Sequence, residues 1–196
     1  QLHDVQIAGP GFLNLFLADG WFTGAAAAIE AAGSEWGAGV AAGRERRTQV
    51  EFVSANPTGP ITVASARHAA YGDSLARILE FAGHPVQREY YVNDFGSQIK
   101  NLGASIGARA RGEEVPEGGY QGEYVTELAN SIPGAAEQSD EELSALGVDA
   151  MLERARITLD HFGVHFDRFF SERSLHEVAP GADESALDKA LAIVKA

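Results

Sequence analysis

One segment constrains the fold more than any other part of the chain. Thr48–Ser54 alternates apolar and polar residues as a strand does, and Ser54–Pro60 is rich in Pro, Gly and Asn. A helical pattern follows and stops at Gly83, and Val86–Val92 again has the composition of a strand. Two strands joined by a helical crossover lie parallel in one sheet. The segment therefore predicts an α/β fold with a Rossmann-like parallel sheet.

The rest of the chain divides around this βαβ unit. Two apolar runs separated by Gly9-Pro10-Gly11 predict a pair of short strands, and Ala25–Ala32 predicts a short helix. Ser139 followed by Glu142 is typical of a capping box, which predicts a helix that continues to about Phe162. An extended piece, Val164–Phe170, is expected after it. We predict four regions: residues 1–24 end an amino-terminal domain, 25–46 form a connector, 47–112 begin the Rossmann-like domain, and 113–196 are a truncated, mainly helical insertion.

The helix of the βαβ unit has one apolar face. Its members are Tyr71, Leu75, Ile78, Leu79 and Ala82. Apolar residues at this spacing are typical of the side of a helix that packs on a sheet.

Charge and composition exclude several classes of protein. The chain has 28 acidic and 15 basic residues and a net charge of −13, whereas a nucleic-acid surface needs basic residues to neutralise phosphates. Many of the acidic residues lie after residue 112, so the net charge of the region from Arg44 to Arg111 is closer to zero. Cysteine is absent, which excludes disulfides and thiolate metal sites. No apolar run is long enough to cross a membrane, so we expect a cytoplasmic protein without a membrane partner.

Both ends of the sequence interrupt a pattern. The chain begins at Gln1 within a patterned segment, and the helical spacing of Leu187, Leu191 and Val194 continues to the last residues. We therefore expect a piece of a longer protein.

Two polar loops follow the two strands of the βαβ unit. They are Ser54–Ser65 and Asn93–Gln98, and the carboxyl ends of parallel strands are where such sheets bind ligands. Two interpretations remain open for Asn56-Pro57-Thr58-Gly59: ordinary turn chemistry, or a loop that holds a ligand. The chain has neither the GxGxxG pattern nor the Walker A pattern, which gives no support to dinucleotide dehydrogenases or P-loop enzymes.

Several blocks resemble those of bacterial arginyl-tRNA synthetases, in the same order. The blocks are Gly9–Asn14, Val50–Pro60, Gly72–Leu79, Tyr91–Gln98, Tyr120–Tyr124 and Phe166–Arg173. The resemblance covers nearly the whole chain. It implies a class I enzyme that activates arginine with ATP and transfers it to tRNA, with Mg²⁺ accompanying the ATP.

The resemblance also implies site residues. Positions that correspond to Glu51, Ser54, Asn56 and Gln98 bind arginine in the family, and the loop with Pro57 and Gly59 belongs to the ATP site. A carboxylate is a suitable partner for a guanidinium group, and amides can hold the amino and carboxylate ends of the substrate. The alternative for Glu51 is a solvated strand position. The family resemblance further implies a monomer that contacts tRNA mainly through regions outside this chain.

The sequence departs from the family pattern at the start of the helix. A His-x-Gly-His block is usual there, and this chain has Thr62-Val63-Ala64-Ser65. In one interpretation, the hydroxyls of Thr62 and Ser65 and the imidazole of His68 replace the lost groups as catalytic residues. In the other, the site has lost its ability to stabilise the transition state, which costs about 3 kcal/mol for each preorganised donor removed.

The chain also lacks parts that the family uses. A later lysine-bearing phosphate loop and a helical anticodon-binding domain are absent, so we expect this fragment to be inactive alone. Two alternatives to the ligase remain: a synthetase-like module that binds a ligand or partner without catalysis, and another class I nucleotidyl transferase. No metal site is expected, since Gly163 interrupts the spacing of His161 and His165.

Overall fold

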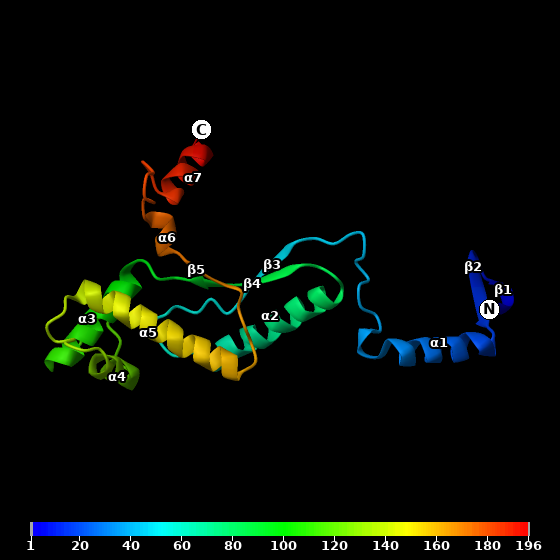
Figure 1. The fold of residues 1–196 in the computed structure, drawn as a ribbon, viewed down its shortest axis with the longest axis horizontal. Helices are drawn as coiled ribbons and strands as arrows, with labels where there is room; N and C mark the ends of the chain where they lie inside the picture. The colour runs from blue at the N-terminus through cyan, green and yellow to red at the C-terminus, as the bar shows by residue number, and fades with distance from the viewer. Residues whose placement is uncertain (1, 196) are drawn as a thin grey trace. The chain divides into compact units, whose positions relative to one another are not determined.

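The computed structural model describes residues 2–195, which form two compact units (Figure 1). One unit comprises the residues up to Glu45 together with Phe81–Gly83, and the other comprises Arg46–Glu80 and the residues from His84 onward.

The first unit begins with an antiparallel hairpin. β1 (Leu2–Ala8) pairs with β2 (Phe12–Leu17), which confirms the predicted strand pair. The helix α1 (Asp19–Ala32) and the short 3₁₀ helix η1 (Gly33–Glu35) follow. The helix begins six residues before the predicted start at Ala25, because each of its two glycines, Gly20 and Gly24, costs only about 1 kcal/mol and neither stops it.

The second unit contains the predicted parallel sheet. Its strands are β3 (Thr48–Glu51), β4 (Val86–Val92) and β5 (Arg168–Ser171), in the order β3-β4-β5 and parallel to one another. The helix α2 (Val63–Phe81) connects β3 to β4 and ends before Gly83, whose φ of 101° is accessible mainly to glycine. The predicted α/β class is confirmed. The extended piece expected after the long helix supplies the third strand.

The strand β3 is shorter than the sequence predicted. Its pairing stops at Glu51 because Val53 and Ser54 have φ values of 64° and 41°, which a strand does not accommodate. The chain therefore turns away from the sheet three residues earlier than the alternating pattern indicated, and the turn directs Ser54 toward the candidate site.

The helix α2 packs on the sheet through small residues rather than through its apolar face. Ala69, Gly72 and Ala76 are buried, and a Cβ at Gly72 would lie 2.2 Å from the Phe52 ring. Tyr71 and Ile78, which the periodicity had placed on the packing face, are 76% and 65% exposed within this chain. Small residues allow the backbone of the helix to approach the sheet closely, which a hydrophobicity pattern does not reveal.

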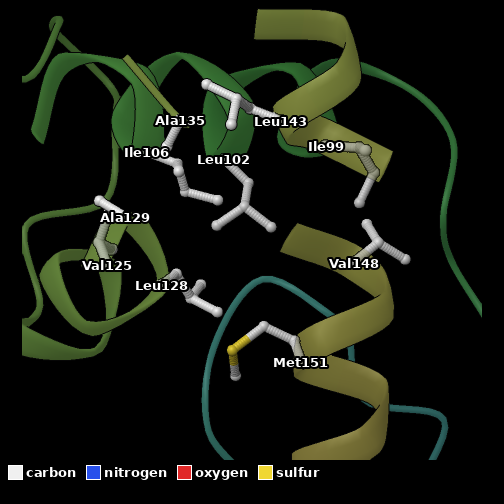
Figure 2. Packing of buried hydrophobic residues seen from close by; sticks show 10 residues of the cluster. All are labelled: Ile99, Leu102, Ile106, Val125, Leu128, Ala129, Ala135, Leu143, Val148 and Met151. Carbon is white, nitrogen blue, oxygen red and sulfur yellow. The ribbon is translucent and has the colours of Figure 1, made fainter. Parts of the chain in front are cut away.

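Three further helices form the main hydrophobic core. They are α3 (Ser97–Arg111), α4 (Glu123–Ser131) and α5 (Asp140–His161). Figure 2 shows their apolar side chains converging, among them Leu102, Ile106, Leu128 and Met151. The predicted capping box is present, with Glu142 N donating to Ser139 Oγ at 3.2 Å and Ser139 N donating to Glu142 Oε2 at 3.0 Å.

Two short helices complete the second unit. They are α6 (Arg173–His176) and α7 (Ala186–Lys195). Among the described residues, every helix is too short or too polar to span a lipid bilayer.

Candidate functional site

The candidate site lies where β3 and β4 end. The chain leaves β3 into the loop that precedes α2, and it leaves β4 into the loop that precedes α3. In a parallel sheet these two loops are neighbours at one edge, and the structure joins them directly. Asn56 Nδ2, in the first loop, donates a hydrogen bond of 2.7 Å to Gln98 Oε1 in the second. Both side chains are exposed, so they remain accessible to a ligand.

A second pair of predicted residues lies at the end of β3. Ser54 Oγ donates a short hydrogen bond to Glu51 Oε1, and Tyr91 N donates to the same Ser54 hydroxyl at 3.0 Å. The serine therefore links the carboxylate to β4. Glu51 itself is exposed, and its second oxygen is available to a cation.

Several carboxylates lie near Tyr91 at this edge of the sheet. The pKa of the Tyr91 hydroxyl is raised first by burial and then by the carboxylates of Glu172, Asp94 and Glu51. Negative charges disfavour ionisation of a neighbouring phenol, so the direction of the shift reflects three carboxylates in the neighbourhood of this hydroxyl. A cationic ligand is the kind that such a surface attracts.

Asp94 connects the end of β4 to the end of β5. Its side chain is buried and accepts hydrogen bonds from Ser171 Oγ at 2.6 Å and from Arg173 N at 2.9 Å. Neither Asp94 nor Glu172 was predicted from the sequence to be a site residue. A signal was present, because Asp94 follows β4 directly and Glu172 follows β5, the position at which parallel sheets place functional side chains.

The residues predicted to contact ATP lie at the start of α2. Thr62 Oγ1 and Ser65 Oγ are 3.3 Å apart, and Ser65 N donates to Thr62 Oγ1 at 3.4 Å. Thr62 therefore occupies the capping position of the helix. Hydroxyls beside unpaired N–H groups at a helix N-terminus are a suitable set for phosphate oxygens. His68 lies one turn further on and is exposed, and it contacts neither Thr62 nor Ser65 through a hydrogen bond.

The loop between Ser54 and Thr62 is held by two tyrosines that the sequence did not indicate. Tyr90 Oη donates to Ala55 O at 2.8 Å, and Tyr124 Oη donates to Thr58 O at 2.7 Å. Pro57 and Thr58 are buried, whereas Gly59 is half-buried. Burial raises the pKa of Tyr90 to about 12, so this hydroxyl remains a donor at neutral pH.

A pocket of about 330 Å³ lies beside the same loop. Pro60 and Ile61 line one side, and Met151, Ala155 and Thr158 of α5 line the other. A second pocket, of about 420 Å³, lies between α5 and the segment that leads into β5. Neither pocket is lined by Glu51, Asn56 or Gln98, whose side chains are exposed within this chain.

Comparisons with known proteins identify relatives of this chain. The sequence model of the family described as tRNA synthetases class I (R), catalytic domain, matches residues 29–118. An arginine–tRNA ligase of Renibacterium salmoninarum is 49% identical over 194 residues, which cover 94% of this chain and 35% of the relative. An arginine–tRNA ligase of Heliobacterium modesticaldum is 41% identical over 204 residues, covering 96% of this chain and 35% of the relative. The chain thus spans about a third of the length of the curated relatives that it matches.

Solved structures agree with these matches. The solved structure of Thermus thermophilus arginyl-tRNA synthetase matches 99% of this chain and 32% of its own length, with a TM-score of 0.62 and 23% identity. The likeness at that identity concerns the fold. A Campylobacter jejuni structure assigned as an arginyl-tRNA synthetase matches 78% of this chain and 34% of its own length, with a TM-score of 0.66 and 35% identity.

Proposed function

Because this chain belongs to the arginyl-tRNA synthetase family of class I aminoacyl-tRNA synthetases, we propose that its site serves the activation of arginine with ATP. The whole protein would act as an aminoacyl-tRNA ligase in protein biosynthesis. This chain spans about a third of the relatives' length, so we expect it to supply part of the site and to be inactive alone.

The observation that supports the proposal is that the four residues predicted to bind arginine form two hydrogen-bonded pairs at the carboxyl ends of β3 and β4. Glu51 and Ser54 are hydrogen-bonded to each other, and Asn56 is hydrogen-bonded to Gln98. We propose that Glu51 receives the guanidinium group, with the nearby carboxylates of Asp94 and Glu172 adding to the negative potential. The amides of Asn56 and Gln98 would hold the amino and carboxylate groups.

For ATP we propose the loop and the first turn of α2. Pro57 and Gly59 would line the nucleotide site, and Thr62, Ser65 and His68 would stabilise the phosphates during attack. Their hydrogen-bonded geometry supports Thr62 and Ser65 more directly than the exposed His68. Mg²⁺ would enter with the phosphate oxygens rather than in a cage of protein ligands.

We also propose the partners of the whole protein. Transfer RNA would bind mainly through regions outside this chain, since residues 2–195 carry an excess of acidic side chains that repel phosphate. The protein would act as a cytoplasmic monomer.

Binding of arginine to this chain tests the proposal. We expect weak, saturable shifts of the Glu51, Ser54 and Gln98 amide signals in an NMR titration with arginine. The shifts with lysine should be smaller, because lysine lacks the planar guanidinium group that can donate two parallel hydrogen bonds to a carboxylate. Glu51→Gln should abolish the shifts, whereas Glu114→Gln, in an exposed linker, should retain them.

Equal responses to arginine and to other amino acids would favour a different nucleotidyl transferase. Pyrophosphate exchange by this chain alone would contradict the expected inactivity.

A second candidate function rests on the Thr62-Val63-Ala64-Ser65 segment. It replaces the usual histidines with hydroxyls, which supports a module that binds arginine without activating it. Aminoacylation by the whole gene product would favour the enzyme. Arginine binding by that product without adenylate formation would favour the module.

A further inference from the structure

The helical region beyond residue 113 contacts the loop that leads into α2. Tyr124, in the first turn of α4, donates its hydroxyl to Thr58 O at 2.7 Å, and its ring packs against the core of α3, α4 and α5. We infer that Tyr124 is a positioning residue that fixes the Pro57–Thr62 loop for ATP. This inference rests on the proposed function, because it assigns that loop to the nucleotide.

The composition of the loop explains why it needs an external donor. Pro57 and Pro60 have no N–H group, so the loop has few donors with which to hold itself in place. Thr58 is 7% exposed, and a buried carbonyl without a partner is costly. Tyr90 satisfies Ala55 O from the sheet, and Tyr124 satisfies Thr58 O from the helices. The loop is thus held on both sides, and the Tyr124 bond lies nearer to Thr62.

The backbone around Tyr124 leaves room for its ring. A Cβ on Gly122 would lie 2.5 Å from the Tyr124 ring, although the φ of −63° and ψ of 153° at Gly122 suit any residue. Glycine is therefore required at this position by the ring and not by the backbone. An alanine there would displace the ring and its hydroxyl from Thr58 while leaving the backbone unstrained.

Adjacent contacts reinforce the orientation of the segment. Tyr120 N donates to Ser105 Oγ at 2.9 Å, and a Cβ on Gly119 would lie 2.7 Å from the same oxygen. Burial raises the pKa of Tyr124, so its hydroxyl stays protonated as a donor. The helices α3, α4 and α5 thereby fix the position of residues that would contact ATP. Their role in the site is to hold the loop that precedes α2.

Three variants of this chain test the inference. Tyr124→Phe removes only the hydroxyl, and Gly122→Ala displaces the ring. Tyr120→Phe is the matched control, because Tyr120 packs on the same core and its hydroxyl bonds to no other described residue. We expect backbone order parameters at Gly59 and Ile61 to fall from about 0.85 to below about 0.7 in the first two variants and to stay unchanged in the control.

Affinity for Mg·ATP should follow the same order. We expect about three- to tenfold weaker binding in an NMR titration of Tyr124→Phe and no change in Tyr120→Phe; Tyr124→Phe should also lower the urea midpoint, because Thr58 O loses its hydrogen-bond partner. Unchanged order parameters in both Tyr124→Phe and Gly122→Ala would overturn the inference. If those parameters fall but no variant, nor the parent chain, binds ATP, the positioning of the loop stands and the proposed function fails. A loss of order spread over all helices would mean a structural role only, and would also overturn it.

Discussion

The amino-terminal unit and the α3–α5 helical core use apolar residues in opposite ways. In the first unit Ile7 and Phe12 are 86% and 69% exposed, and no side chain of α1 is buried. In the helical core Leu102, Ile106 and Leu128 are fully buried. Both regions have regular apolar patterns. Only the packed helices α3, α4 and α5, however, enclose a hydrophobic core from which water is excluded. A two-stranded hairpin has too little surface to bury its own side chains and is marginally stable in water.

The difference indicates where the free energy of folding originates. The helical core should hold the second unit together by itself, whereas the first unit exposes an apolar surface of the kind that normally contacts a partner. Both tryptophans, Trp21 and Trp36, lie in the first unit, and all five tyrosines lie at or beyond Tyr71. Tryptophan fluorescence therefore reports on the first unit, and far-ultraviolet circular dichroism is dominated by the helices of the second.

The largest expected effect comes from removing a core side chain. Leu102→Ala should lower the free energy of unfolding by about 3–4 kcal/mol, because it leaves a cavity among α3, α4 and α5. Leu13→Ala, on the exposed hairpin, should change it by less than about 0.5 kcal/mol. Urea unfolding followed by circular dichroism measures both. Similar decreases in the free energy of unfolding for the two variants would show that the hairpin is buried in solution. That result would contradict the contrast between the two regions.

Alkaline pH should act on the second unit alone. Burial raises the pKa of Tyr90 to about 12 in the folded state, against about 10 when unfolded, so folding favours the neutral phenol. The resulting stability is complete below pH about 10 and is lost as the pH rises through about 12, a loss of about 2–3 kcal/mol. Urea titrations across this range should show it, and Tyr90→Phe should remove that component. A parallel change in tryptophan emission would mean that the two units unfold together.

Two glycines should respond to alanine with opposite signs. A Cβ on Gly103 would lie 2.1 Å from Asp140 O, so Gly103→Ala should separate α3 from α5 and cost about 2 kcal/mol. A Cβ on Gly24, inside α1, would meet no atom within 4 Å, so Gly24→Ala should stabilise that helix by up to about 1 kcal/mol. Thermal unfolding of both variants sharpens the contrast between a closed and an open region. A destabilised Gly24→Ala would contradict it.

The sequence predicted most elements because their signals are local. The hairpin, β4, the capped helix from Ser139 and the parallel arrangement of β3 and β4 follow from periodicity and turn residues, and all are confirmed. The packing face of α2 was wrong, because close contact through Gly72 depends on a neighbouring strand and leaves no hydrophobic signal. The early end of β3 was missed for a similar reason, since no propensity indicates a positive φ at valine.

For the candidate site, the sequence predicted the residues of the two loops but not the residues that hold the loops in place. Asn56 and Gln98 were expected together and are hydrogen-bonded, although their roles with arginine remain predictions. Tyr124, Asp94 and Arg173 were not expected to contact the loops, because each acts across a separation of many residues. Such contacts depend on the tertiary fold and cannot be read from spacing.

The short outer strands of the sheet have a consequence for how this chain behaves at high concentration. β3 and β5 lie at the two edges, and each is only four residues long. Edges of that length offer few backbone groups for adding strands, which makes growth of this sheet into cross-β fibrils unfavourable. Self-association should therefore proceed through the hairpin, because β1 and β2 are seven and six residues long, expose apolar side chains and each leave one edge unpaired.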